Sequence, residues 1–261
     1  MSVIGTNIAV SIRGKPILHG VDFDAQPGQI HAIVGPNGSG KTTLLRALTG
    51  EIGASGRITL NDHSFDRKRP WEMASMRGVL PQATVLSFPF TVIEVVRMGL
   101  EAGRHGASPE IAHQALREVS LEGYEGRFFQ ELSGGEQQRA QLARVLSQVW
   151  EPVHDGAPCW LFLDEPVASL DIGHQLGVME LARRYADRSG GVIAVMHDLN
   201  LTAMFADQVT LLSKGKVAAT GDVANVLTDD LLSAAYDCAL RVNAAPSLGK
   251  TFFLPHTAMR S

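Results

Sequence analysis

The chain has 261 residues, of which 45% are hydrophobic and 19% are charged, and its formal net charge is −4 at pH 7. This length suits one domain with an inserted subdomain, and the lack of a basic excess argues against nucleic acid as a partner. The N-terminus does not resemble a signal peptide, no apolar run approaches the ~18 residues of a membrane span, and two cysteines imply no disulfide framework, so we expect a cytosolic protein.

Three short apolar runs predict buried parallel strands. They are "QIHAIVG" at 29–35, "CWLFLD" at 159–164 and "GVIAVMH" at 191–197, and helical stretches lie between them. This alternation predicts an α/β core, in which phosphate chemistry is expected at the carboxyl ends of the strands.

A phosphate-binding loop follows the first of these strands. The pattern G-x-x-x-x-G-K-[ST] is matched by "GPNGSGKT" at 35–42, between an apolar strand and a helical segment. Its backbone would wrap the phosphates, Lys41 would pair with the β- and γ-phosphates, and the Thr42 hydroxyl would ligate magnesium. The predicted nucleotide-binding residues are Gly35, Pro36, Asn37, Gly38, Ser39, Gly40, Lys41, Thr42 and Thr43.

A helical insert is predicted after Gln82, over residues 83–154. Thr91 and Glu94 form a capping box, and Ser108 followed by Pro109 is typical of a helix start. Gln82 itself is a candidate sensor of the γ-phosphate or of magnesium. Val92, Val95 and Val96 form an apolar face, for which docking of a partner and ordinary core packing both stay open.

A second anion site is predicted within this insert, in "LSGGEQQR" at 132–139. An apolar stripe at Leu142, Val145, Leu146 and Val149 indicates an amphipathic helix that begins just after Ser133. A helix N-terminus presents free backbone N–H groups, and Gly134 and Gly135 would let a phosphate approach the backbone.

Polar side chains end the two remaining buried strands. Asp164 would hold the magnesium shell, and Glu165 could polarise the attacking water. His197 follows the strand at 191–197 and faces the same edge of the sheet. Alone, the acidic pair would be an ordinary turn and the histidine a structural residue, whereas their position beside the phosphate loop favours function. Beyond them, "VTLLSKGKVAATG" predicts a hairpin that turns at Lys214-Gly215.

Taken in order, "GPNGSGKT", Gln82, "LSGGEQQR", "LFLDEP", "ASLD" at 168–171 and His197 resemble the ATP-binding cassette family over about residues 3–222. The "LSGGQ"-type signature separates this family from other P-loop ATPases. The resemblance implies a RecA-like P-loop NTPase core with an antiparallel β subdomain and an inserted α-helical subdomain. The chain 1–261 would be a single ABC ATPase domain, with the nucleotide-binding core at 1–82 and 155–222, the helical insert at 83–154 and a C-terminal extension at 223–261.

The family also implies how the two anion sites cooperate. The signature of one subunit caps the ATP held by the P-loop of the other, so a homodimer would complete two identical sites. Glu165 is then the general base, His197 positions the γ-phosphate, and Asp171 lies at the dimer seam. The signature residues acting in trans are Ser133, Gly134, Gly135 and Glu136, and the residues assigned to Mg2+ are Thr42, Gln82 and, through water, Asp164.

One departure from the family concerns the adenine. The family stacks the base on an aromatic residue upstream of the P-loop, where this chain has Ile12. Either Ile12 packs against the base, or the Arg13 guanidinium stacks on it, or this edge is ordinary strand.

The remaining segments bear on what ATP hydrolysis drives. "FPFTVIEVVRMGL" at 88–100, the extra loop at 151–158 and the ending "TFFLPH" look most like ATPases of the hemin-import subgroup. This resemblance implies an ATP- and Mg2+-dependent importer subunit, peripheral on the cytoplasmic face of a bacterial inner membrane. Its partners would be a second copy of the chain, two copies of a permease and, indirectly, a substrate-binding protein, with no nucleic acid. Ferric-siderophore or cobalamin import, an exporter and a soluble cassette ATPase are the alternatives.

Overall fold

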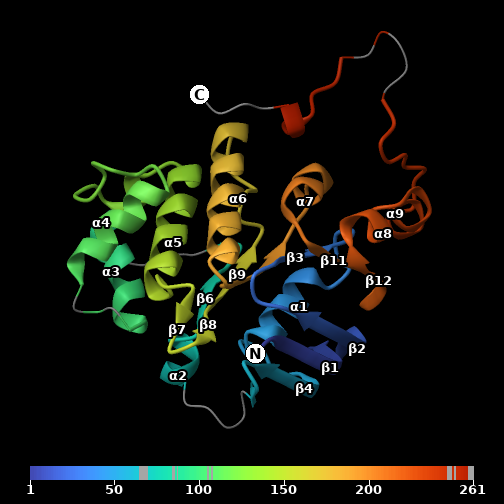
Figure 1. The fold of residues 1–261 in the computed structure, drawn as a ribbon, viewed down its shortest axis with the longest axis horizontal. Coiled ribbons are helices and arrows are strands. Elements are labelled where there is room, and N and C mark those ends of the chain that lie inside the picture. Colours follow the sequence, from blue (N-terminus) through green and yellow to red (C-terminus); the bar gives the residue numbers. More distant parts are fainter. Residues whose placement is uncertain are drawn as a thin grey trace.

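The computed structural model describes residues 1–64, 70–83, 86, 88–104, 106, 108–245, 249 and 251–257. Two large sheets, a two-stranded sheet of β7 (Val153–His154) and β8 (Ala157–Pro158), and a set of helices make up this part of the chain (Figure 1). Within it, no helix is long and apolar enough to cross a membrane.

A six-stranded sheet forms the centre of the molecule, in the order β12-β11-β3-β10-β9-β6. The five strands from β6 to β11 pair in parallel, and β12 is antiparallel to β11. The three strands predicted from apolar runs are β3, β9 and β10, which lie next to one another in this sheet. The bounds of the six strands are β3 Ile30–Val34, β6 Arg77–Leu80, β9 Trp160–Asp164, β10 Gly191–Val195, β11 Gln208–Ser213 and β12 Lys216–Asp222.

Alternate side chains of this sheet enter two separate cores. On β9, Leu161 and Leu163 belong to the core beneath the helices, and Trp160 and Phe162 belong to the core on the opposite face. Both faces are covered, which is why β3, β9 and β10 read as continuous apolar runs rather than as alternating ones.

The second sheet is antiparallel and has the order β2-β1-β4-β5. Helix α1, Lys41–Leu48, lies between the two sheets, where Leu44, Leu45 and Leu48 are fully buried. The strands are β1 Val3–Ile12, β2 Lys15–Ala25, β4 Ser55–Leu60 and β5 His63–Ser64. With the helical group described next, this sheet gives the α/β architecture that the sequence predicts.

The helices of the insert gather on one side of the central sheet (Figure 1). Helices α3 and α4 pack against α5. The capping box at Thr91 and Glu94 and the start of α4 at Pro109 are present as predicted. Val92, Val95 and Val96 are fully buried, so their apolar face packs in the core. Besides β6, the elements between β5 and β9 are α2 Pro70–Ala74, α3 Val92–Ala102, α4 Pro109–Glu118, η2 Phe129–Glu131, α5 Gly134–Gln148, β7 Val153–His154 and β8 Ala157–Pro158.

The last elements pack against the sheet and then leave it. Helices α6, Ile172–Asp187, and α7, Leu199–Phe205, follow β9 and β10. The predicted hairpin is β11 and β12, which turn at Lys214-Gly215. Beyond α8 Val223–Val226 and α9 Asp229–Tyr236, the short helix η3 Pro255–Thr257 returns to contact α7.

Candidate functional site

The phosphate-binding loop connects β3 to α1 and has a backbone that only glycine tolerates. Gly35 has φ 144°, and a Cβ added there would lie 2.1 Å from the carbonyl oxygen of Leu212. Gly40, the residue that precedes α1, has φ 103°. These two constraints fix the loop between the sheet and the helix, so that the N–H groups of the first turn of α1 stay available for an anion.

Lys41 and Ser39 lie inside this loop. The Lys41 Nζ atom donates to the carbonyl oxygens of Gly35, at 2.9 Å, and Pro36, at 3.1 Å. Burial lowers the pKa of Lys41, and the nearby carboxylates of Glu165 and Asp164 oppose that shift. The Ser39 hydroxyl is buried, with no hydrogen-bond partner in the described part of the chain. A cation and a free hydroxyl at the bottom of a glycine loop are suited to hold a phosphate.

Hard oxygen donors stand beside the loop. The Thr42 hydroxyl donates to Asp164 Oδ1 at 3.1 Å, and burial raises the pKa of the Asp164 carboxyl. In the described ranges, no group of three or more His, Cys, Asp or Glu side chains could hold a metal ion. A hydroxyl and one carboxylate fit an ion that takes its other ligands from phosphate and water.

Glu165 brings together the side chains that the sequence predicts as catalytic. Its carboxylate contacts His197 Nε2 at 2.5 Å through Oε1 and accepts a hydrogen bond from Gln82 Nε2 at 3.0 Å through Oε2. Gln82 follows β6, Glu165 follows β9 and His197 follows β10. The three adjacent parallel strands thus place all three groups at one carboxyl edge.

Gln138 is a member of this cluster that the sequence analysis did not single out. It lies in the second turn of α5, and its Nε2 donates to the carbonyl oxygen of Glu165 at 2.9 Å. Glu165 has φ 52°, and its N–H donates to the carbonyl of Val195 at 3.2 Å. The helical insert is therefore joined directly to the backbone of the candidate base.

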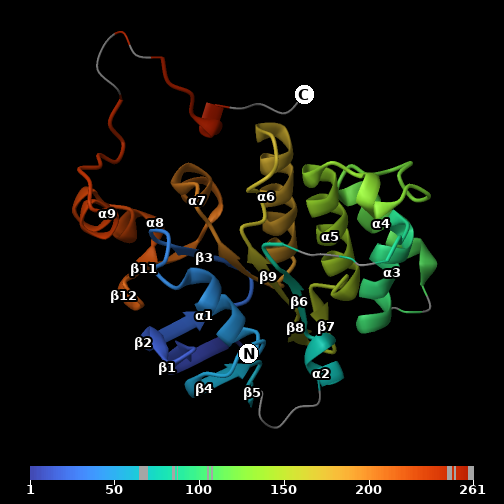
Figure 2. The same ribbon diagram turned by 180° about the vertical axis from the view of Figure 1, so that it is seen from behind.

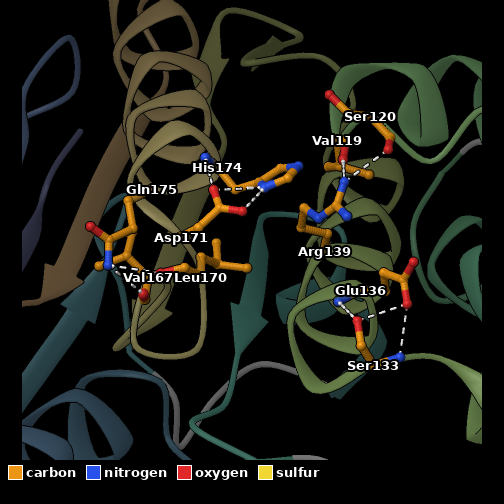
Figure 3. Close-up of polar contacts among 10 residues, drawn as sticks. All are labelled: Val119, Ser120, Ser133, Glu136, Arg139, Val167, Leu170, Asp171, His174 and Gln175. Atoms are coloured by element: carbon orange, nitrogen blue, oxygen red, sulfur yellow. Dashed lines mark hydrogen bonds and ion pairs between the residues drawn. The ribbon is translucent and has the colours of Figure 1, made fainter. Parts of the chain in front are cut away.

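Helix α5 begins after Ser133, where the sequence predicts a second anion site. Ser133 is the N-cap, and Glu136 accepts hydrogen bonds from both the Ser133 N–H and its hydroxyl (Figure 3). Ser133 and Gly134 are exposed. Gly135 packs on the segment before α6, since a Cβ there would lie 3.1 Å from the carbonyl oxygen of Ser169.

Asp171 caps α6 close to this site. Its carboxylate accepts from the His174 N–H at 3.0 Å and contacts the His174 ring, on the side of α6 that faces Arg139 of α5 (Figure 3). These contacts with His174, together with the charge of Arg139, lower the pKa of Asp171. The turn before it is fixed by Gln175, whose Nε2 donates to the carbonyls of Val167 and Leu170.

Arg139, which is buried, is the second residue of the signature that sequence reasoning missed. Its guanidinium donates to the carbonyl oxygens of Val119 and Ser120, at 2.9 and 2.8 Å, where α4 ends. This contact ties α4 to α5 by satisfying helix-end carbonyls. The sequence offered one signal for this contact, since Arg139 lies three residues after Glu136 on a helix with a buried face.

The two predicted anion sites of one chain lie at the starts of different helices, α1 and α5. These helices are drawn on opposite sides of α6 in both views (Figures 1 and 2).

Ile12, where the family would place an aromatic residue, ends β1. It is 43% exposed, and the turn that follows has Arg13 and Gly14 at φ 50° and 76°. The side chain is therefore available to a ligand rather than part of either core.

Comparison with known proteins agrees with this geometry. The ABC transporter family model matches residues 18–168. The hemin import ATP-binding protein HmuV of Jannaschia sp. (strain CCS1) is 62% identical over 255 residues, which cover 98% of this chain and 94% of that protein. HmuV of Roseobacter denitrificans (strain ATCC 33942 / OCh 114) is 57% identical over 260 residues and 100% of both chains.

A crystal structure of a nucleotide-free ATP-binding cassette from an ABC transporter has the same fold. Its TM-score is 0.77 at 23% identity, and the match covers 90% of this chain and 99% of that one. Together with the phosphate loop, the signature helix and the cluster around Glu165, these similarities establish that the chain belongs to the ABC transporter family, as an ATP-binding cassette.

Proposed function

We propose that this chain is the ATP-hydrolysing subunit of a hemin importer. The observation that carries the proposal is the similarity to proteins named hemin import ATP-binding protein, at 62% and 57% identity over 98% and 100% of the chain. At that coverage the similarity includes the loop at 151–158 and the C-terminal segment, and is not confined to the motifs that all cassettes share.

The chemistry assigned to the site is attack of water on the γ-phosphorus of ATP. Glu165 accepts the proton of that water, and its carboxylate is already oriented by Gln82 and His197 from the two neighbouring strand ends. His197 Nε2 contacts Glu165 Oε1 at 2.5 Å. When ATP binds, His197 turns to the γ-phosphate, and this oxygen of Glu165 becomes available to the water.

We assign Mg2+ to the oxygen donors beside the loop. Thr42 and Asp164 would hold it, Asp164 through water, and Gln82 would add its amide oxygen, since its amide nitrogen donates to Glu165. When bound, the ion would neutralise charge on the β- and γ-phosphate oxygens. Lys41 and the N–H groups of α1 supply the rest of the positive potential.

The arrangement of the two anion sites supports a homodimer. Because α1 and α5 lie on opposite sides of α6, the signature of one copy is available only to the ATP of another (Figure 1). The signature assigned in trans comprises Ser133, Gly134, Gly135 and Glu136. Within it, Ser133, Gly135 and the helix N-terminus would contact the γ-phosphate, and Asp171 would lie at the seam. ADP lacks that phosphate, so hydrolysis would release the dimer.

We place the dimer on the cytoplasmic face of a bacterial inner membrane, where it binds two copies of a permease. A substrate-binding protein would deliver the cargo to that permease. Nucleic acid has no part in this function.

The permease contact is assigned to the exposed aromatic side chains that precede α3 and α5. Phe88 is 67% exposed and Phe128 is 45% exposed, and Gln130 holds the backbone of the segment by donating to the carbonyl of Phe88. We retain the division into a core at 1–82 and 155–222, an insert at 83–154 and an extension at 223–261, since only the insert carries both this surface and the signature.

Uptake into liposomes tests the proposal. The protein and its co-purifying permease are reconstituted, and hemin, a ferric siderophore and cobalamin are offered in turn through matching binding proteins. We expect only hemin to accumulate. Glu165→Gln should bind ATP, hydrolyse it at least ~100-fold more slowly and abolish uptake, because a positioned base contributes at least that much.

The outcomes separate the parts of the proposal. Accumulation of another chelate would contradict the cargo and leave the nucleotide chemistry intact. Near-normal turnover by Glu165→Gln would remove Glu165 from the role of base. A ribosome or DNA co-purifying in place of a permease would contradict transport itself.

A further inference from the structure

Two helices of the insert begin with the same capping box. At α3, Glu94 accepts hydrogen bonds from the Thr91 N–H and hydroxyl, both at 2.7 Å. At α5, Glu136 accepts from the Ser133 N–H at 2.8 Å and from its hydroxyl at 2.7 Å. The hydrogen bonds are the same, but only the second box lies at the signature.

The carboxylate at the signature occupies the donors that the proposed function needs. Ser133 has one N–H and one hydroxyl proton, and Glu136 takes both. Under the proposed function, on which this inference rests, the same hydroxyl would meet the γ-phosphate of the partner's ATP. The carboxylate of Glu136 thus occupies the two donors of Ser133 that a bound phosphate would use.

Glu136 is charged in this position. Hydrogen bonds from Ser133 and from the Tyr124 side chain, with the charge of Arg139 adding to them, lower its pKa. The Arg139 guanidinium, however, is committed to the carbonyls of Val119 and Ser120 and forms no ion pair with Glu136 in the described chain. A full negative charge therefore remains on Glu136, at the place where the γ-phosphate of the partner's ATP would bind.

We propose that Glu136 is an autoinhibitory residue of the trans site, which raises the ATP concentration needed to close the dimer. The "LSGGQ"-type signature has glutamine at this position. Glutamine can complete a capping box equally well, so the box alone does not require the charge. What glutamate adds is a negative charge, which repels the γ-phosphate and makes the hydrogen bond from the Ser133 hydroxyl charge-assisted and therefore stronger.

ATP-driven dimerisation of the full-length chain tests this directly. In the Glu165→Gln background, where hydrolysis is slow, the ATP concentration at half-maximal dimer is measured with and without Glu136→Gln. The matched control is Glu94→Gln, which removes the same charge from the same kind of box. Glu136→Met is added because it removes the charge without introducing an amide donor.

We expect Glu136→Gln and Glu136→Met to lower the half-maximal ATP concentration about fivefold at ~0.05 M salt, and Glu94→Gln to leave it unchanged. The difference should shrink at ~0.5 M salt, because ions screen exposed charges. Equal values for the Glu136 and Glu94 variants would overturn the proposal, and so would a gain that is confined to Glu136→Gln or persists at high salt. Absence of any ATP-dependent dimer in the parent variant would instead overturn the proposed function and this inference together.

Discussion

The position of the candidate base, Glu165, depends on an unusual backbone conformation. Its backbone is left-handed, at φ 52°, a conformation that costs a non-glycine residue about 1 kcal/mol. The surroundings hold it there, since the carbonyl accepts from Gln138 and the N–H donates to Val195. This conformation turns the side chain of Glu165 to Gln82 and His197, while Asp164, one residue earlier, faces Thr42.

Ile12 gives a prediction at the same scale. Replacing this 43%-exposed side chain by tyrosine supplies a ring where the family stacks adenine. We expect the Kd for ATP to fall about fivefold, since one base–aromatic stack contributes ~1–3 kcal/mol and Ile12 would already cover part of the adenine. Titration of the variant and the parent chain with ATP and with GTP measures this change in Kd. Ile4→Tyr, at the other end of β1, is the control, and unchanged affinity in Ile12→Tyr would mean that the base binds elsewhere.

The sequence predicted the residues at strand ends and missed those that act across helices. Gln82, Glu165 and His197 each follow an apolar strand, so one rule about parallel sheets brings them to the same edge. Gln138 contacts Glu165 across 27 positions of the chain, and Gln175 fixes the backbone before Asp171 through two carbonyls. A glutamine on a helix is a common surface residue, and nothing in its spacing reveals a backbone partner on another element.

At the scale of elements, α5 joins the insert to the core at both of its ends. Near its start Gln138 donates to the Glu165 carbonyl, and at its end Gln148 donates to the carbonyls of Ala74 and Arg77, at 2.8 and 3.0 Å. A movement of the signature therefore reaches the candidate base through one rigid helix.

These two glutamines give a matched pair of variants. We expect Gln138→Ala to lower kcat about tenfold with little change in ATP affinity, because a lost hydrogen bond of ~1.4 kcal/mol misplaces Glu165 while the P-loop is intact. Gln148→Ala loses comparable bonds away from the site and should lower the melting temperature without that loss of kcat. Steady-state kinetics and thermal denaturation compare them, and equal kcat values would contradict the role of Gln138.

The sequence predicted helices and strands correctly where cap residues or continuous apolar runs mark them. Helices α3, α4 and α5 begin at their predicted caps, and β3, β9 and β10 coincide with apolar runs. The antiparallel sheet was expected only from the family resemblance. The pairing of β1 with β2 shifts register at several points and Asn7 has φ 52°, so the alternation of apolar and polar residues that marks a strand is interrupted.

At the scale of the whole molecule, the chain has two predicted anion sites on different helices. Helices α1 and α5, which follow the glycine loop and the signature, are drawn on opposite sides of α6 (Figure 2). Under the proposed function each is half of a nucleotide site, and a two-fold dimer would pair them. Such a dimer would account for the one P-loop and one signature of a single chain and for ATP, rather than ADP, holding two copies together.

The measurement that tests this most directly is the molecular mass of the Glu165→Gln chain in solution with ATP, compared with Glu165→Gln/Ser133→Arg. We predict an ATP-dependent dimer for the first and a monomer for the second, with equal ATP affinity in both, because arginine blocks the signature and leaves the P-loop unchanged. Ser55→Arg, on the exposed start of β4, serves as the control and should dimerise normally. Dimerisation of the Ser133→Arg variant at the same ATP concentration would contradict capping in trans.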